Sequence, residues 1–302
     1  MADTFQAPSR LAGANFVGGE WRRSSSGETY EKRNPARPSE LVGEFAASSE
    51  ADALERRAEQ VARDMTREMG KPLRESQVEA ARGAAILRYF AGEALRPVGE
   101  LYQQSLSGNA VYTIRRPLGV VGLITTWNFP AAIPLWKASP ALIFGNTAVL
   151  KLAQDAPLTG LHIAECFAEA GLAPGVLNVL TGAGSTAGAA LVRDPRVRAI
   201  LFTGSVPVGV SVREEATRLG KRVQLELGGH NPLIVMADAK LDAAVEAAYA
   251  GAFWSAGQKC TATRRIYVQD AVYDEFRRRL LDRIARGKVG DPADPETEVG
   301  RS

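Results

Sequence analysis

The chain has 302 residues, of which 45% are hydrophobic and 24% are charged, and its formal net charge is +3. These values are typical of a soluble globular protein with a sizeable core and, at this length, two domains. A small, scattered charge argues against a nucleic-acid-binding protein, and the basic runs at residues 22–23 and 277–279 are interpreted as solvated faces.

Cysteine content and the N-terminal sequence predict the cellular compartment. Two cysteines are too few for a disulfide framework, and MADTFQAPSR has no apolar secretion signal. We therefore expect a cytoplasmic protein. The uncharged run 117–136 is long enough for a membrane helix, but its prolines and glycines favour a strand, a loop and a helix instead. The two histidines and two cysteines are scattered, so no metal site is expected.

The first part of the chain predicts short strands, two helices and a hairpin. Strands are expected where β-formers lie between turn signals, at residues 15–21, 29–33 and 41–46. Apolar residues recur at helical spacing over 51–69, where Gly70 and Pro72 end the pattern, and a second helix is expected over 73–95. Residues 101–116 predict a pair of strands around a turn at 107–109.

From residue 120 onward, short apolar strands alternate with helical segments. The strands are expected at residues 120–124, 147–151, 176–180, 199–202, 222–225, 232–236 and 265–268. The helices are expected at residues 131–144, 159–170, 185–192, 208–219, 241–254 and 272–286. This alternation predicts an α/β fold with a Rossmann-like, mostly parallel sheet and helices on both faces. Ligands of such sheets bind beyond the carboxyl ends of the strands. A domain boundary is expected near Gly228.

The stretch FWSAGQKCTATR, residues 253–264, contains Cys260 among small residues. A thiolate is a strong nucleophile when a substrate can approach it, and Lys259 adds positive potential. The alternative is a buried structural cysteine, which is our interpretation of Cys166 on the helical tract 159–170. His162, on the same tract, is interpreted as a surface or packing residue, and His230 has no assigned partner.

Four loops that follow strands carry glycine or small polar residues. In ITTWNFP, Asn128 can donate to an oxyanion, or it can be a turn residue. TGAGSTAG nearly matches the dinucleotide fingerprint but is a weak signal. In FTGSVPVG, Ser205 opens a helix and offers an anion site, or it is an ordinary cap. In QLELGGHNP, Glu226 can be a general base, or it can simply reach solvent.

Taken together, these loops resemble the NAD(P)-dependent aldehyde dehydrogenase superfamily. The resemblance runs from about Phe16 to Gly300 and includes TREMGKPL, RRPLGVVGLITTWNFP, FGNTAVLK, FTGSVPVG, LELGGHNP and GQKCTA. It implies that Cys260 attacks an aldehyde, that its own N–H and the Asn128 side chain hold the oxyanion, and that Glu226 activates water to hydrolyse a thioester. Lys137 is also usual near such a site.

The resemblance implies NAD or NADP as cofactor. It places the pyrophosphate near Ser205 and Trp127, the adenosine ribose near Lys151 and the nicotinamide near Leu227. The implied cofactor-binding residues are Ile124, Thr125, Thr126, Trp127, Lys151, Gln154, Gly184, Thr203, Gly204, Ser205, Val208, Gly209 and Leu227. Gln154 stands where a ribose-binding glutamate is usual, so we expect NADP to be tolerated.

The family pattern also implies a domain organisation. It comprises a dinucleotide-binding domain (8–100 and 119–228), an oligomerisation hairpin (101–118) and part of a catalytic domain (229–302). A short segment between Ser48 and Ala53 and the C-terminal part of the family pattern are expected to be missing. The chain looks most like semialdehyde dehydrogenases; Arg88 and Arg96 could attract a substrate carboxylate, although solvent-facing arginines are the preferred interpretation. The expected partners are a small aldehyde and further copies of the chain, as a dimer or tetramer. The alternative is a non-catalytic remnant that binds a nucleotide or serves in assembly.

Overall fold

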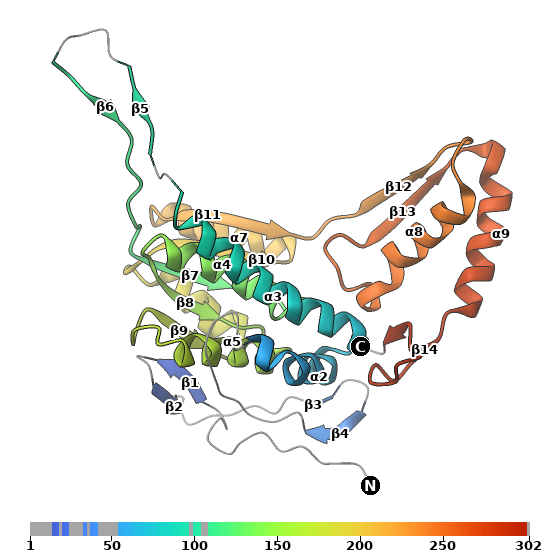
Figure 1. Ribbon diagram of the computed structural model, residues 1–302, viewed down its shortest axis with the longest axis horizontal. Coiled ribbons are helices and arrows are strands. Elements are labelled where there is room, and N and C mark those ends of the chain that lie inside the picture. The colour runs from blue at the N-terminus through green and yellow to red at the C-terminus, as the bar shows by residue number, and fades with distance from the viewer. Residues whose placement is uncertain are drawn as a thin grey trace.

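The computed structural model describes residues 14–17, 20–23, 33–34, 37–41, 54–96, 99–103 and 108–300. Its centre is a seven-stranded sheet in the order β11-β10-β7-β8-β9-β1-β2 (Figure 1). The five parallel strands are β7 (Val120–Ile124), β8 (Thr147–Lys151), β9 (Leu177–Leu180), β10 (Val197–Gly204) and β11 (Arg222–Leu227). The antiparallel strands β1 (Ala14–Val17) and β2 (Glu20–Arg23) form one edge. The predicted α/β fold with a mostly parallel sheet is confirmed.

Helices cover both faces of this sheet, as the sequence predicted. One face carries α2 (Ala58–Met69), α3 (Leu73–Glu93), α4 (Ala132–Ile143) and α5 (Pro157–Glu169), and the other carries α6 (Ala189–Arg193) and α7 (Val206–Arg218). Strand β7 shows why two cores form. Successive side chains of a strand point to opposite faces, so Val121 and Leu123 enter the larger core whereas Ile124 enters the core beside α6 and α7.

Buried carboxylates attach the helices of the larger core to one another. The Glu68 side chain of α2 accepts hydrogen bonds from the backbone N–H groups of Leu158 and Thr159 and from the Thr159 hydroxyl. These N–H groups belong to the first turn of α5, which has no partner for them within its own helix. Glu68 therefore satisfies the N-terminus of a helix that lies about ninety residues away in the sequence.

A second lobe follows residue 228. It contains the parallel pair β12 (Asn231–Val235) and β13 (Thr263–Val268) with α8 (Leu241–Phe253) and α9 (Asp270–Arg286). Its own core is formed by Val235, Val245, Ala248 and Phe276. Figure 1 shows this lobe beside the main sheet, and a short parallel pair, β14 (Val289–Gly290) and β15 (Val299–Gly300), follows α9.

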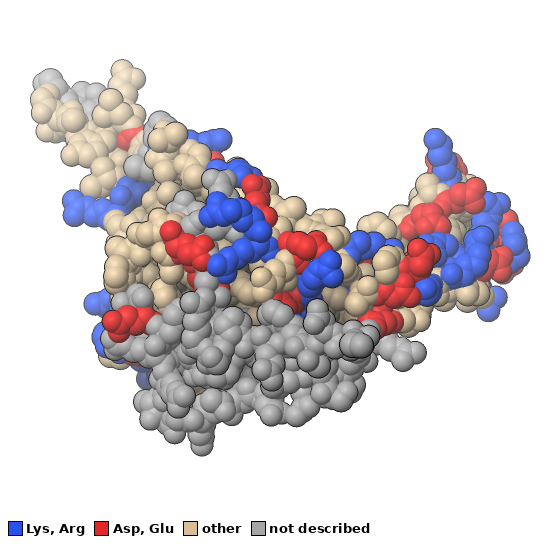
Figure 2. All heavy atoms as spheres, turned by 60° about the horizontal axis from the view of Figure 1, so that its bottom comes forward, with Lys and Arg blue, Asp and Glu red and all other residues tan. Residues whose placement is uncertain are grey.

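The surface of the second lobe carries mixed charge. Arg278 and Arg279 of α9 pair with Glu275 of the same helix, as expected for a solvated face. Figure 2 shows acidic and basic side chains side by side on this lobe rather than a patch of one sign. The other basic run, 22–23, lies in β2, where only the backbone of these two residues is described.

A hairpin projects from the main body (Figure 1). Its strands β5 (Leu101–Tyr102) and β6 (Val111–Tyr112) pair antiparallel, which confirms the predicted hairpin within residues 101–116. Leu101 is 79% exposed and Tyr112 is 63% exposed. In the described part of the chain, all four residues of these two strands are therefore exposed.

Most predicted elements from residue 51 onward are confirmed, with shifted ends, whereas the N-terminal strands are partly wrong. The segment 15–21 is two antiparallel strands, β1 and β2, because the chain reverses between them. Of the strand expected at 41–46, the described part contains only Leu41, the last residue of β4 (Arg37–Leu41), which pairs with β3 (Arg33–Asn34). Residues 29–32, 42–46 and 48–53 lie outside the described part. The helix expected at 185–192 begins with a π-helical turn, η2 (Gly184–Gly188), before α6.

His162 is not a surface residue but lies buried among charged groups. Its Nε2 atom lies 3.1 Å from Asp64 Oδ2, and its Nδ1 atom lies 3.7 Å from Glu165 Oε2. Arg57 also contacts Glu165, at 2.9 Å. The cluster joins α2 to α5. Burial lowers the pKa of His162, but the hydrogen bonds and charges of Asp64 and Glu165 outweigh it and raise this pKa to about 9.

Arg88 and Arg96 are engaged with acidic neighbours on the surface. Arg88 forms an ion pair with Glu55, and Arg96 pairs with Glu93 at 3.1 Å. All four side chains except that of Glu93 are about half exposed or more. The interpretation as solvent-facing arginines is the one that the structure bears out. Among the described residues, no helix has both the length and the apolar character needed to cross a bilayer.

Candidate functional site

The carboxyl ends of the parallel strands bring several predicted site residues into one row. Ile124 at the end of β7 pairs with Phe202 on β10 and with Lys151 on β8. One step further along, Thr203 pairs with Glu226 on β11. The register therefore assembles residues from four strands at one edge of the sheet, where ligands of such folds bind.

The loop after β7 contacts the loop that carries the cysteine. The amide nitrogen of Asn128 donates to the backbone carbonyl of Gln258 over 2.9 Å, and the Thr126 hydroxyl donates to Asn128 Oδ1 over 2.7 Å. Trp127 Nε1 donates to the Gln258 side-chain oxygen over 2.5 Å. Asn128 is thus fixed against a residue only two positions before Cys260. Sequence reasoning missed Gln258, although its place in GQKC was the available signal.

Cys260 is exposed, whereas Cys166 is buried. Burial raises the pKa of Cys166 to about 12, which fits its predicted place in the core. The backbone carbonyl of Cys260 accepts a hydrogen bond from Asn231 Nδ2 over 2.6 Å. Lys259 donates to the carbonyl of Ala250 over 3.1 Å, so its ammonium is held by the end of α8 rather than directed at solvent. Burial lowers the pKa of Lys259.

The turn before the cysteine, η3 (Trp254–Gly257), has an unusual backbone. Ser255 and Ala256 have φ values of 57° and 53°, and Gly257 follows at 71°. Ser255 and Ala256 are the only described non-glycine residues with positive φ. Side chains with a Cβ adopt this region at a cost, and such residues persist only where the surroundings hold them. The nucleophile candidate is therefore presented by a strained turn.

Glu226 lies within β11 and is exposed, which is the alternative that the sequence left open for it. Gln224 Nε2 donates to Glu226 Oε1 over 2.8 Å, and Lys137 Nζ donates to Gln224 Oε1 over 3.3 Å. Lys137 itself is only 4% exposed. Burial lowers its pKa to about 8 despite the opposing charge of Glu226. Sequence reasoning missed Gln224, although alternation along a strand places it on the same face as Glu226.

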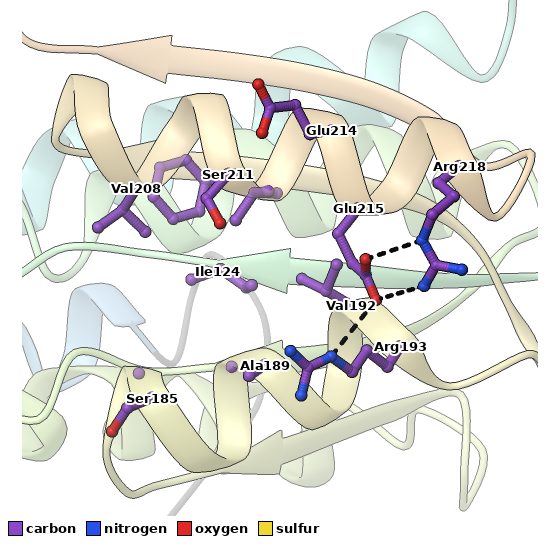
Figure 3. Close-up of a pocket in the computed structure, with 14 residues that line it drawn as sticks. Ile124, Ser185, Ala189, Val192, Arg193, Val208, Ser211, Glu214, Glu215 and Arg218 are labelled. Carbon is purple, nitrogen blue, oxygen red and sulfur yellow. Dashed lines mark hydrogen bonds and ion pairs between the residues drawn. The ribbon is translucent and has the colours of Figure 1, made fainter.

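A cavity of about 550 Å³ lies between α7 and the segment formed by η2 and α6 (Figure 3). Ile124, Gly184 and Val208, three of the predicted cofactor-binding residues, line it. Phe202 adds an aromatic wall. Figure 3 shows Val208 and Ser185 toward one end of the cavity, whereas Glu215 lies toward the other. Glu215 contacts Arg193 at 3.3 Å and Arg218 at 2.8 Å. A mostly apolar slot with polar ends suits a planar heterocycle.

The first turn of α7 lies at this cavity. Ser205 is its N-cap residue but makes no capping hydrogen bond through its side chain, so it is not an ordinary serine cap. The free N–H groups of a first helical turn attract anions. Gly204 and Gly209 are required for close packing, since a Cβ on Gly204 would lie 2.4 Å from Phe202 and one on Gly209 would lie 2.4 Å from Leu227.

The remaining predicted cofactor residues lie around the same edge. Thr125 and Lys151 are buried and joined by a backbone hydrogen bond of 3.2 Å, whereas Gln154 is exposed in the following turn. Burial lowers the pKa of Lys151, and the charge of Asp155 opposes this. His230 is exposed. In the described ranges, no group of three His, Cys, Asp or Glu side chains could hold a metal ion.

Comparison with known proteins identifies relatives over most of the chain. A family model described as the aldehyde dehydrogenase family matches residues 28–301. The chain is 42% identical to an alpha-ketoglutaric semialdehyde dehydrogenase of Bacillus subtilis, covering 95% of this chain and 65% of that protein. It is 36% identical to the NADP(+) succinate-semialdehyde dehydrogenase of Escherichia coli, covering 94% and 66%.

Solved structures show the same likeness. The aldehyde dehydrogenase of Brucella melitensis superimposes with a TM-score of 0.91 at 35% identity, over 97% of this chain and 67% of that chain. A 3,6-anhydro-L-galactose dehydrogenase solved in complex with NAP superimposes with a TM-score of 0.89 at 31% identity, over 98% and 67%.

The matched relatives are longer than this chain. It spans about 65% of the length of the Bacillus protein. The alignment with that protein runs over 318 residues, which exceeds the 302 residues of the chain, so the relative also has residues without a counterpart inside the matched region. With a family model matching nearly the whole sequence and solved relatives sharing the fold, the chain belongs to the aldehyde dehydrogenase family.

Proposed function

We propose that the chain oxidises an aldehyde to its carboxylic acid with a nicotinamide cofactor and with Cys260 as the nucleophile. The observation that carries the proposal is the contact of the Asn128 amide with Gln258, because it places a hydrogen-bond donor beside the loop of an exposed thiol. Family membership supports the same reaction class.

The first step is attack of the Cys260 thiolate on the carbonyl carbon. A carbon–sulfur bond forms, and the carbonyl π electrons move to the oxygen. The amide nitrogen of Asn128 has two hydrogens, of which one is donated to the carbonyl of Gln258, so the second is available to the oxyanion together with the backbone N–H of Cys260. Donors fixed in advance stabilise such a charge without reorganisation.

The cavity and the start of α7 fit a dinucleotide. The apolar slot between Val208 and Gly184 suits an adenine ring, and the N-terminus of α7 at Ser205 suits a diphosphate. A nicotinamide held there would supply the hydride acceptor that oxidation of the substrate carbon to a thioester requires. Hydride leaves the substrate carbon as the electrons of the alkoxide oxygen re-form the carbonyl, and the oxyanion donors contribute earlier, by stabilising the alkoxide that must form first.

Glu226 is proposed to complete the reaction by taking a proton from water, whose oxygen attacks the thioester and releases the Cys260 thiolate. The contacts of Gln224 support this role because they hold the carboxylate and connect it to Lys137. Overall, an aldehyde, water and the oxidised cofactor become a carboxylic acid, the reduced cofactor and a proton.

The substrate class, the cofactor preference and the assembly follow as finer proposals. Two relatives at 42% and 36% identity are semialdehyde dehydrogenases, which supports a carboxylate-bearing aldehyde. NADP should be accepted as well as NAD, since Gln154 adds no negative charge near Lys151. We also propose a domain seam near residue 228, after β11, and self-association through the hairpin β5–β6, whose apolar side chains are exposed.

A second candidate function is a binding or assembly module without catalysis. It is favoured by the outer face of the second lobe, where Ile234 is 67% exposed and Tyr267 is 53% exposed. An outer face of this kind is suited to contact with further protein.

Two variants and one control distinguish the proposals. The wild-type chain, given a semialdehyde and NAD or NADP, should produce absorbance of the reduced cofactor, and Cys260→Ala should not. Glu226→Gln should accumulate a covalent adduct that intact mass spectrometry assigns to Cys260. Cys166→Ala is the control and should turn over normally, because its thiol is buried. A flat trace from a folded wild-type chain that still binds cofactor would instead favour the binding module.

A further inference from the structure

Helix α3 carries two carboxylates, Glu75 and Glu79, that contact the two halves of the candidate oxyanion site. They are four positions apart in the sequence, so they lie one above the other on the same face of the helix. The first lies against the turn that precedes Cys260, and the second lies against the helix that follows Asn128. Figure 1 shows the first turns of α3 near the end of α8.

Glu79 holds the start of α4. Its Oε1 atom accepts hydrogen bonds from the backbone N–H groups of Ala131 and Ala132 over 2.8 and 2.9 Å. Its other oxygen pairs with Lys71, and both side chains are buried, at 1% and 0% exposure. The Lys71 ammonium also lies 4.9 Å from the centre of the Phe129 ring. The backbone on the C-terminal side of Asn128 is therefore fixed by α3 and by Lys71, which lies two positions before the helix begins.

Glu75 holds the strained turn of the cysteine loop. Its Oε2 atom accepts a hydrogen bond from the Ser255 hydroxyl over 2.6 Å. Ser255 is buried and begins the left-handed run that leads to Gly257. The Ser255 carbonyl in turn accepts from the backbone N–H of Gln258 over 2.9 Å, so the contact of Glu75 reaches the residue that Asn128 touches.

We infer that Glu75 and Glu79 are positioning residues that together set the distance between Cys260 and the Asn128 amide. The two loops lie about 130 residues apart in the sequence and meet through the contacts of Gln258. A rigid helix attached to both loops limits their relative movement. An error of about 1 Å in such a geometry costs on the order of a hundredfold in rate. The expected effect on kcat rests on the proposed function, whereas the expected effect on the movement of the two loops does not.

The test compares glutamine with leucine at each carboxylate, because the two side chains are similar in size and only glutamine can accept a hydrogen bond. At Glu75 the pair is Glu75→Gln and Glu75→Leu. At Glu79 both changes are made together with Lys71→Met, so that no buried ammonium loses its partner. The control is Gln77→Leu, also on α3, whose amide donates to the exposed Glu59 and contacts neither loop.

Two measurements are made on each variant that shows the wild-type circular dichroism. The leucine variants should lower kcat by about ten- to a hundredfold with KM within about twofold of wild type, whereas the glutamine variants should retain most of kcat. Amide hydrogen exchange should rise about tenfold in residues 253–262 for Glu75→Leu, and in residues 126–132 for the leucine variant at Glu79. The control should match wild type in both.

Equal exchange and equal kcat in the leucine and glutamine variants would overturn the inference. A change in KM alone would also overturn it, since that result would mean altered substrate binding rather than altered geometry of the reacting groups. If the wild-type chain shows no turnover, the proposed function fails, and the exchange comparison still decides whether α3 holds the two loops.

Discussion

Replacing His162 by glutamine should remove a pH dependence of folding stability that originates between α2 and α5. His162 lies between the carboxylates of Asp64 and Glu165, and these groups raise its pKa from 6.5 to about 9 although burial acts in the opposite direction. Because the folded state binds this proton more tightly than the unfolded state, the stabilisation is complete below pH 6.5. It is lost as the pH rises through 9.

The magnitude follows from the size of the pKa change. Each unit corresponds to about 1.4 kcal/mol, so a change from 6.5 to about 9 contributes about 3 kcal/mol to the free energy of unfolding. Lys137 acts with the opposite sign. Burial lowers its pKa from 10.5 to about 8, so its folding penalty is relieved as the pH rises between these values. The pH dependence of the wild-type stability therefore contains the contributions of both His162 and Lys137, which have opposite signs and partly cancel.

Urea unfolding, followed by the fluorescence of the tryptophans, measures the effect in wild type and in His162→Gln at several pH values between 6 and 9.5. The difference between the two proteins isolates His162, because Lys137 is present in both. We expect wild type to be the more stable at pH 6, and we expect its advantage to shrink by about 3 kcal/mol by pH 9.5.

A matched control is His230→Gln, which removes the other histidine of the chain, an exposed residue outside this cluster. The stability difference between wild type and His230→Gln should not change with pH in the way expected for His162→Gln. A gap between wild type and His162→Gln that is constant over the whole pH range, or that widens as the pH rises, would refute the reasoning.

Four further outcomes test other parts of the structure. Iodoacetamide at pH 8 should add one label, at Cys260, while Cys166 stays unmodified because burial raises its pKa to about 12; peptide mass spectrometry would show a second label if this is wrong. Gln154→Glu should lower turnover with NADP relative to NAD by about tenfold, through repulsion of the extra phosphate; an unchanged ratio in initial-rate assays would contradict this. Gln224→Leu should slow thioester hydrolysis, seen as more acyl-enzyme in rapid-quench samples, and an unchanged acyl-enzyme level would argue against its contact. Glu68→Ala should lower the free energy of unfolding by at least about 2 kcal/mol, since buried N–H groups lose their acceptor; a smaller loss in urea titrations would disprove the capping role.

The parallel sheet could be predicted from the sequence because its signals are local. Residues 120–124 and 147–151 are mostly apolar runs that begin directly after Gly119 and Asn146, and the strands β7 and β8 have the same ends. Their last residues, Ile124 and Lys151, pair with each other, so the loops that follow both strands begin at the same edge of the sheet. The doubled glycine at 18–19 was also a local turn signal, but the segment 15–21 was interpreted as a single strand.

The buried charges could not be predicted in the same way. Glu68 and Glu79 lie on helices that also have exposed residues, where a polar side chain normally lies, whereas His162 lies on α5, whose residues 157–167 are all buried. Each is buried because a distant segment packs over it: the partner of Glu79 lies 52 residues away and that of His162 lies 98 residues away. The periodicity of a helix does not indicate which distant helix end will pack against a given residue. The role of α3 in holding both loops was invisible in the sequence for this reason.

The hairpin β5–β6 has a consequence for how the molecule unfolds. Two strands alone are only marginally stable in water, and Leu101 and Tyr112 are largely exposed among the described residues. The hydrogen bonds between β5 and β6 can therefore break without disturbing the seven-stranded sheet. If another copy packs on the hairpin, the temperature at which its two strands separate would depend on protein concentration. The unfolding temperature of the seven-stranded sheet would not.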